Sequence, residues 1–178
     1  MMKFAFISFL TVSLAFFLHI LIVYYLPNVI MLIAFHQMTY KYKTQTNAFF
    51  HTGTPSPELR NVPKPDPNLL YSLCTYDVSK HPVRFTAPVP DCSWSISFYA
   101  RNSTNFYATN DQTIGSNDFS LTLVGKKYKK RVKTDINTMI APSDKGMVII
   151  RISIMGHKHP EDLVQLQKHA LCTPVLSY

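Results

Sequence analysis

Two carboxylates, Asp77 and Asp111, lie where acid–base chemistry could be placed. Each lies beside a run of alternating apolar and polar residues that predicts a β-strand. If the two strand ends converged, one carboxyl group could act as a general acid and the other as a general base. Aspartate at a strand end more often caps a turn through its side-chain oxygen. The sequence leaves both interpretations open.

A pair of histidines, His157 and His159, is the second candidate for chemistry. Residues two apart on a strand point to the same side, so the two imidazoles could bind a metal ion together with a third ligand. The alternative is that His159 caps a helix beginning at Pro160, while His157 is solvated. Beyond this weak metal hypothesis the sequence indicates no cofactor, and we expect none.

The three cysteines, Cys74, Cys92 and Cys172, do not have the spacing of a zinc site, since there is no C-x-x-C motif. In an oxidising compartment we expect one disulfide and one remaining thiol. We favour a bond between Cys74 and Cys172, which would connect an early strand to the last helix. The alternative is three buried, reduced thiols.

A strongly basic run occupies residues 126–133. Its six basic residues are Lys126, Lys127, Lys129, Lys130, Arg131 and Lys133. Such a run is usually a solvated loop or hairpin. The functional hypothesis is a contact with anionic lipid, worth about 1 kcal/mol for each basic residue near a charged surface.

The chain carries a formal net charge of +8. A basic balance is compatible with nucleic acid, an anionic membrane surface or acidic partners. Because the chain also has a candidate membrane anchor, the membrane surface is the expected partner, and another envelope protein is a further candidate. We do not expect nucleic acid to be a partner.

The N-terminal segment determines where all these residues lie relative to a membrane. It contains an uncharged apolar run from Phe4 to Leu26. A helix of this length measures about 34 Å, which is enough to cross a hydrocarbon core of about 30 Å. The alternative is a cleaved signal peptide, whose apolar region is shorter and ends in small residues. We therefore predict a transmembrane anchor at residues 1–27, which Pro27 ends or kinks.

Two segments connect the anchor to the domain. Residues 28–43 begin with a short apolar stretch and then alternate Tyr and Lys, which is typical of a helix at a membrane interface. A continuation of the anchor helix, packed on the domain, is the equal alternative. Residues 44–68 are rich in proline, and we expect a linker or strap over the domain surface.

Residues 69–178 are long enough for one domain with one core. Short alternating segments separated by turn residues predict a β-sandwich or a barrel-like sheet. The expected strands are 71–78, 83–87, 93–100, 106–108, 119–124 and 147–155, the last of them central because it is the most apolar. A helix beginning at Pro160 and stopped by Thr173-Pro174 closes the chain. The predicted fold class is α+β, mostly β.

Several motifs, in this order and spacing, resemble a known family. They are Tyr71–Ser79 (YSLCTYDVS), Pro82-Val83, Pro90–Tyr99 (PDCSWSISFY), Asn105–Tyr107 and Asn110-Asp111, followed by Cys172. The chain is similar to the short, single-anchor bacterial members of the domain of unknown function 1254. The basic run at residues 126–133 departs from that family, in which this region is usually less basic.

The resemblance implies a membrane-anchored envelope protein with a β-rich domain, and it implies no activity or catalytic residues. We expect a single-pass protein of the bacterial inner (cytoplasmic) membrane with its soluble domain in the periplasm. The first functional hypothesis is a non-enzymatic binding or structural module at the membrane surface. The second is an envelope enzyme that acts on a small molecule through Asp77 and Asp111 or through a histidine-bound metal.

Overall fold

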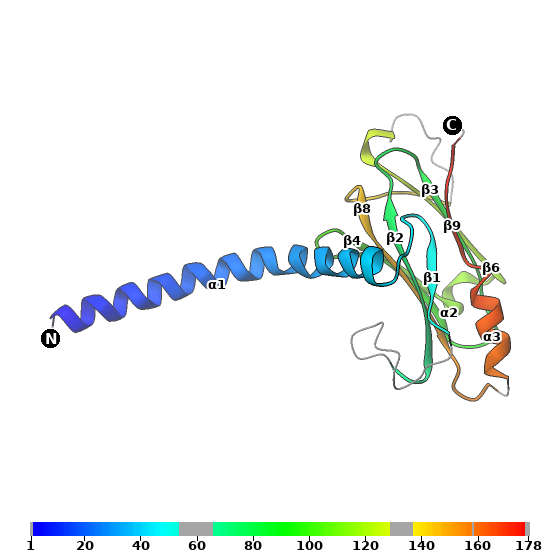
Figure 1. The fold of residues 1–178 in the computed structure, drawn as a ribbon, viewed down its shortest axis with the longest axis horizontal. Coiled ribbons are helices and arrows are strands. Elements are labelled where there is room, and N and C mark those ends of the chain that lie inside the picture. Colours follow the sequence, from blue (N-terminus) through cyan, green and yellow to red (C-terminus); the bar gives the residue numbers. More distant parts are fainter. Residues whose placement is uncertain (1, 54–65, 129–136, 158, 177–178) are drawn as a thin grey trace.

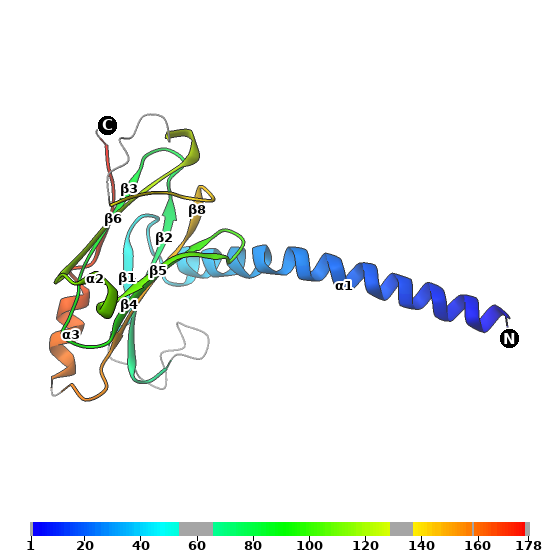
Figure 2. The ribbon, with the colours of Figure 1, turned by 180° about the vertical axis from the view of Figure 1, so that it is seen from behind.

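The computed structural model describes residues 2–53, 66–128, 137–157 and 159–176 of the chain. Figure 1 shows a long N-terminal helix that projects from a body made of two β-sheets. Seen from behind in Figure 2, the N-terminus again lies at the free end of this helix, far from the sheets. The expected α+β fold with mostly β content is confirmed.

The helix α1 (Met2–His36) continues through Pro27 and leads into a π-helical turn, η1 (Gln37–Lys41). The helix therefore does not end at the proline, although a proline in a helix interior removes one backbone hydrogen bond. Of the two alternatives for residues 28–43, the structure has the continuous helix packed on the domain. Met31 and Met38, on this part of the chain, are both buried.

Sheet A has five strands in the order β1-β2-β8-β4-β5, and all neighbours are antiparallel. Its strands are β1 (Phe49–His51), β2 (Leu69–Asp77), β4 (Trp94–Ala100), β5 (Asn105–Asn110) and β8 (Lys145–Ser153). The central position of β8 confirms the expectation drawn from its apolar sequence. Strand β1 comes from the segment predicted to be a linker or strap, and it extends the sheet at one edge.

Sheet B has the order β7-β6-β3-β9, and only β6 and β7 are parallel. Its strands are β3 (Val83–Pro88), β6 (Asp118–Val124), β7 (Thr138–Ile140) and β9 (Leu171–Pro174). Two short helices, α2 (Asp111–Ile114) and η2 (Lys126–Tyr128), precede and follow β6. The described strands form two separate layers. Of the two predicted architectures, the structure therefore has the β-sandwich and not the barrel-like sheet.

The end of the chain differs from the sequence prediction. The helix α3 (Pro160–Gln167) begins as expected, but it is short, and β9 follows it. Cys172 therefore lies in a strand, opposite Phe85 of β3, rather than near the end of a helix. Pairing with the open edge of β3 satisfies backbone groups that a longer helix would have satisfied internally.

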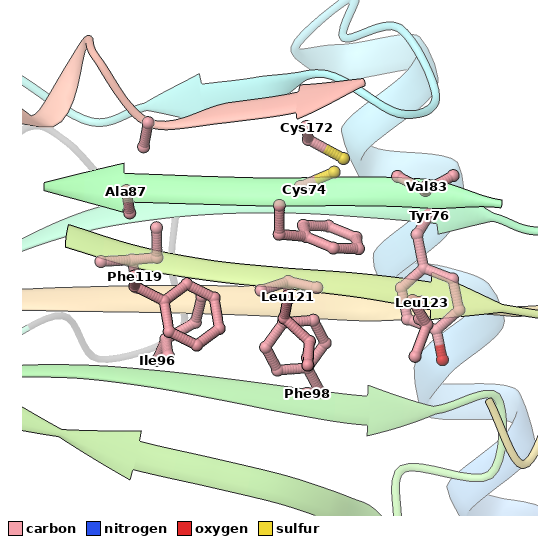
Figure 3. Packing of buried hydrophobic residues seen from close by; sticks show 14 of the residues in the cluster. Cys74, Tyr76, Val83, Ala87, Ile96, Phe98, Phe119, Leu121, Leu123 and Cys172 are labelled. Carbon is pink, nitrogen blue, oxygen red and sulfur yellow. The ribbon is translucent and has the colours of Figure 1, made fainter. Parts of the chain in front are cut away.

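The core lies between the two sheets, where alternate residues of each strand point inward. Aromatic side chains fill it, and the rings of Phe85 and Phe98 meet edge to face with centroids 5.1 Å apart. Figure 3 shows these inward-pointing residues together with the two sulfur atoms of Cys74 and Cys172. Leu163 of α3 is buried against the same core, so the last helix also contributes to it.

Gly146 gives a test of how tightly the sheets are packed. The Tyr76 hydroxyl donates to the Tyr99 carbonyl at 3.2 Å, and a methyl group on Gly146 would collide with both of these oxygens. We expect Gly146→Ala to lower the free energy of unfolding by about 1–3 kcal/mol. Thermal unfolding of the full-length protein in detergent measures the change.

The matched control is Gly53→Ala, because nothing lies within 4 Å of the methyl group it would add. This variant should unfold like the wild type. An equal loss of stability in both variants would contradict the packing described around Gly146.

Candidate functional site

The end of α1 is packed against the outer face of sheet A. Met31 of α1 and Met38 of η1 form a buried cluster with Leu73 of β2 and Met147 of β8. This cluster is separate from the core between the sheets. Figures 1 and 2 show the helix meeting sheet A on one side of the sandwich, with α3 on the side away from α1.

A second contact joins α1 to the loop between β4 and β5. The Ser103 hydroxyl donates to the Pro27 carbonyl at 2.9 Å. Ser103 has φ +63°, a left-handed backbone conformation that turns this hairpin tightly. The helix is therefore attached to the domain at two levels, one at Pro27 and one at the methionine cluster.

A cavity of about 290 Å³ lies beside this junction, and its walls differ in character. The helical wall is formed by Leu32, Phe35 and Thr39, and the opposite wall is formed by Thr46, Tyr76, Asp77, Arg101 and Lys145. One wall is mainly apolar, whereas the other carries two cations and one carboxylate. We call this cavity the junction groove.

Asp77, one of the two candidate carboxylates, lines the junction groove. Its carboxylate accepts a hydrogen bond from the Ser79 N–H at 2.9 Å and pairs with the Lys145 ammonium at 3.4 Å. Burial raises the pKa of Asp77, but the Ser79 hydrogen bonds and the Lys145 charge together outweigh it, so the pKa is lowered overall. Asp77 is thus an ionised turn cap and ion-pair partner.

Another cation, Arg151, lies on the same face of sheet A, across the helix end from the junction groove. Its guanidinium donates to the Ser97 hydroxyl at 3.4 Å. Burial raises the pKa of the neighbouring Tyr99 phenol, but hydrogen bonds from Arg151 and other groups outweigh burial, and the pKa is lowered. The outer face of sheet A therefore carries cations on both sides of the helix end.

The structure does not bring Asp111 to Asp77. The Asp111 carboxylate accepts a hydrogen bond from the backbone N–H of Trp94 at 3.0 Å. Trp94 pairs with Ile152 of β8, whereas Asp77 pairs with Lys145 at the other end of this strand. Seven residues of strand separate the two pairs, which is about 23 Å. The two carboxylates are too far apart to act on one substrate atom.

The predicted metal ligands lie at the surface. His159 precedes α3 and makes no side-chain cap, and its Nδ1 lies 3.2 Å from a Glu161 carboxylate oxygen. His157 is exposed in the preceding turn. Among the residues that the structure describes, no three His, Cys, Asp or Glu side chains gather as a metal site would require.

The cysteines lie partly as expected. Cys74 of β2 and Cys172 of β9 are both buried, and Figure 3 shows their sulfur atoms facing each other between the sheets. Burial raises the pKa of the Cys74 thiol, and the hydrogen bond to Cys172 raises it further. The structure has these two residues and Cys92 as free thiols, so the disulfide is not confirmed.

Only part of the basic run lies within the described residues. Lys126 and Lys127 are exposed on η2, and the Lys127 ammonium lies 4.9 Å from the centroid of the Tyr128 ring. The other four basic residues, Lys129, Lys130, Arg131 and Lys133, lie outside the described residues.

A polar network that the sequence did not predict joins β1, β2 and α3. The His51 Nδ1 lies 2.8 Å from the Ser72 hydroxyl, which lies 3.5 Å from the Gln167 side-chain oxygen. Burial lowers the pKa of His51, and the charge of Lys168 lowers it further. Ser72 is 1% exposed, so the network ties three elements together rather than presenting a nucleophile. No local spacing could have revealed it, since Ser72 and Gln167 are 95 positions apart.

The family model described as "Protein of unknown function (DUF1254)" matches residues 46–174. The chain belongs to this family. The match begins before β1 and ends with β9, so it covers both sheets and confirms the resemblance seen in the motifs.

Two solved structures from bacteria share the fold. The VPA0106 protein from Vibrio parahaemolyticus is 12% identical, with a TM-score of 0.63 over 84% of this chain and 36% of its own. A putative uncharacterized protein from Burkholderia cenocepacia is 15% identical, with a TM-score of 0.51 over 76% and 36%. The chain thus spans about a third of each of these proteins. No curated protein matches it.

The network around His51 predicts a pH dependence of stability. Because the folded-state pKa of His51 is lowered from about 6.5, the unfolded chain binds the proton more readily. The contribution of His51 should be complete above pH 6.5, and it should be lost as the pH falls from 6.5 through the folded-state pKa. His51→Asn retains a hydrogen-bonding group without titrating, so its thermal unfolding midpoint should fall less between pH 8 and pH 5.

The comparison variant is His81→Asn, which changes an exposed histidine in the turn after β2. This variant should retain the wild-type pH profile. Identical profiles for His51→Asn and the wild type would show that the His51 network does not contribute to the acid sensitivity.

Proposed function

We propose that this protein is a single-pass membrane protein of the bacterial cell envelope, whose β-sandwich is a non-enzymatic binding or structural module at the membrane surface. The observation that carries the proposal is the packing of the end of α1, through Met31 and Met38, onto the outer face of sheet A. A helix packed in this way would hold one face of the sandwich toward the bilayer. The partners are the lipid bilayer and, in addition, another envelope protein.

The exposure of α1 supports its role as a membrane anchor. It is the one helix among the described residues that is long and apolar enough to cross a membrane, and a signal sequence meets the same criteria. Large apolar side chains are exposed all around it, from Phe4 to Ile33. A helix that is apolar on every side needs a lipid or protein environment. The helix also continues without a break into the part packed on sheet A, which favours an anchor over a cleaved signal.

Structural roles of the two aspartates support a binding module over an enzyme. Asp77 caps a turn and pairs with Lys145, and Asp111 accepts from the Trp94 backbone. The pair lies about 23 Å apart, as estimated from the strand spacing. The enzyme hypothesis based on these two carboxylates therefore has no geometric support.

A periplasmic location of the domain completes the proposal. Basic residues do not select the orientation, since Lys41 and Lys43 follow the apolar helix and Lys3 precedes it. Long domains translocate largely regardless of charge. In the periplasm the facing thiols of Cys74 and Cys172 would be oxidised to a disulfide that links β2 to β9, with the two electrons passed to a thiol-oxidising enzyme.

The membrane-facing arrangement can be tested by depth quenching. The full-length protein, with Cys92→Ser, is labelled with a fluorophore at Asn102→Cys in the β4–β5 loop and placed in nanodiscs. Lipids carrying a nitroxide on the headgroup should quench this probe strongly, because the loop contacts α1 at Pro27.

The control is a probe at Gln165→Cys, an exposed position of α3 on the side away from α1. It should be quenched weakly. Equal quenching at both positions would contradict a domain held with sheet A toward the bilayer, and the proposal would then be wrong.

Thiol counting tests the compartment. The protein is denatured directly from cells in a maleimide reagent that adds a visible mass to each free thiol. We expect one free thiol without reductant and three with it, because Cys74 and Cys172 would be bonded. Cys172→Ser should expose the Cys74 thiol and give two free thiols under both conditions.

Three free thiols without reductant would contradict the disulfide. The location is then tested separately. Intact cells that contain the surface variant Gln165→Cys are treated with a membrane-impermeant maleimide, which labels the domain only if it lies outside the inner membrane. Labelling only after permeabilisation of the inner membrane would place the domain in the cytoplasm and overturn the periplasmic proposal.

A further inference from the structure

We propose that the junction groove binds the phosphate of an anionic phospholipid, such as phosphatidylglycerol, with Arg101 and Lys145 as the phosphate ligands. The inference rests on the proposed membrane anchor and names a ligand for the same junction. Four observations support it: the depth of the groove, the positioning of its two cations, its apolar wall and its size.

The groove begins at the outer edge of the lipid headgroups when α1 spans the bilayer. The uncharged apolar run ends at Leu26, and the contact of Ser103 with Pro27 follows at once. Leu32 is six residues, or about 9 Å, beyond Leu26 along the helix. The headgroup layer extends about 5–8 Å beyond the hydrocarbon core. The near end of the groove is therefore at the outer edge of the headgroup layer, next to the lipid phosphates.

One hydroxyl links the backbones of the two cationic residues. The Ser143 side chain accepts a hydrogen bond from the backbone N–H of Arg101 at 3.0 Å and donates to the backbone carbonyl of Lys145 at 2.7 Å. It thus connects the end of β4 to the start of β8. Both residues line the junction groove, and lysine and arginine side chains are the groups that bind phosphate in proteins.

Arg101 is available for a ligand. Within the described part of the chain, no carboxylate lies within ion-pair distance of its guanidinium, whereas the Lys145 ammonium pairs with Asp77. The side chain of Lys145 is still 58% exposed, and an ammonium has three donors. With one carboxylate and two cations, the groove has a net charge of +1.

The helical wall suits the glycerol and the upper part of an acyl chain. Leu32 is 62% exposed, and Phe35 is half-buried beside it. An apolar wall that faces a cationic wall matches an amphiphile whose charged and apolar parts are adjacent. A free inorganic anion would use only one of the two walls.

The charge around the helix end favours an anionic lipid over a zwitterionic one. Lys41, Lys43 and Arg151 add further positive charge close to the junction. The trimethylammonium group of phosphatidylcholine would bring a cation into these surroundings, whereas phosphatidylglycerol brings none. The volume of about 290 Å³ suits a headgroup and its glycerol, with the rest of the lipid lying along α1.

Native mass spectrometry of the full-length protein in a neutral detergent tests the proposal. Dioleoyl phosphatidylglycerol should bind at least fivefold more tightly than dioleoyl phosphatidylcholine. Arg101→Gln should weaken phosphatidylglycerol binding about fivefold, which corresponds to the loss of one basic residue at a charged surface. Ser143→Ala, which changes no charge, should also weaken it because the two cations lose their connection. Thermal unfolding without added lipid confirms that each variant is folded.

The matched control is Lys127→Gln, which removes the same charge from η2, a surface outside the groove. It should bind phosphatidylglycerol like the wild type. Loss of binding in Lys127→Gln but not in Arg101→Gln would overturn the proposal in favour of the basic run. Equal affinity for the two lipids would also overturn it. Binding of glycerol 3-phosphate as tight as that of the lipid would identify a soluble anion as the ligand.

Depth quenching separates this inference from the proposed function. If the Asn102 probe is quenched in nanodiscs while Arg101→Gln binds phosphatidylglycerol normally, the lipid site is wrong and the membrane-facing arrangement remains. If the Asn102 probe is not quenched, the membrane-facing arrangement is itself wrong, and the lipid site is overturned with it.

Discussion

The structure depends on one requirement, that both faces of the central strand β8 must be covered. Alternate residues of a strand point to opposite faces, and both sets in β8 contain large apolar side chains. Val148, Ile150 and Ile152 point inward and are covered by sheet B. Met147 and Ile149 point outward, where Met31 and Met38 cover them. The end of α1 therefore acts as a third layer of the domain.

The outward-facing residues of β8 also determine where charge lies. The first four of them along the strand are Lys145, Met147, Ile149 and Arg151, so an apolar centre is bracketed by two cations. A helix end that packs on the apolar centre leaves each cation at one of its sides. The pairing of Lys145 with Asp77 neutralises part of one side only. Hydrophobic packing and electrostatics of the junction thus follow from the same four residues.

The strands could be predicted from the sequence because alternation is a local signal. The central position of β8 could also be predicted, since a strand covered on both faces has a continuous apolar sequence. The course of α1 through Pro27 could not be predicted, because it depends on packing of Met31 and Met38 with residues distant in the sequence. Strand β9 was missed for a similar reason, as Leu163 and Leu166 have helical spacing and only the free edge of β3 explains why Cys172 is extended.

The same distinction applies to the candidate site. Six basic residues between positions 126 and 133 are conspicuous in the sequence, whereas Arg101, Lys145 and Arg151 are isolated in it. Strand β8 carries Lys145 and Arg151, its pairing with β4 brings Arg101 to the turn beside Lys145, and Ser143 links the backbones of Arg101 and Lys145. Strand pairing holds the backbones of Lys145 and Arg151, and Ser143 holds that of Arg101, so less backbone conformational entropy is lost when a ligand binds. Binding specificity is therefore expected from the assembled group, although the contiguous run has the greater charge density.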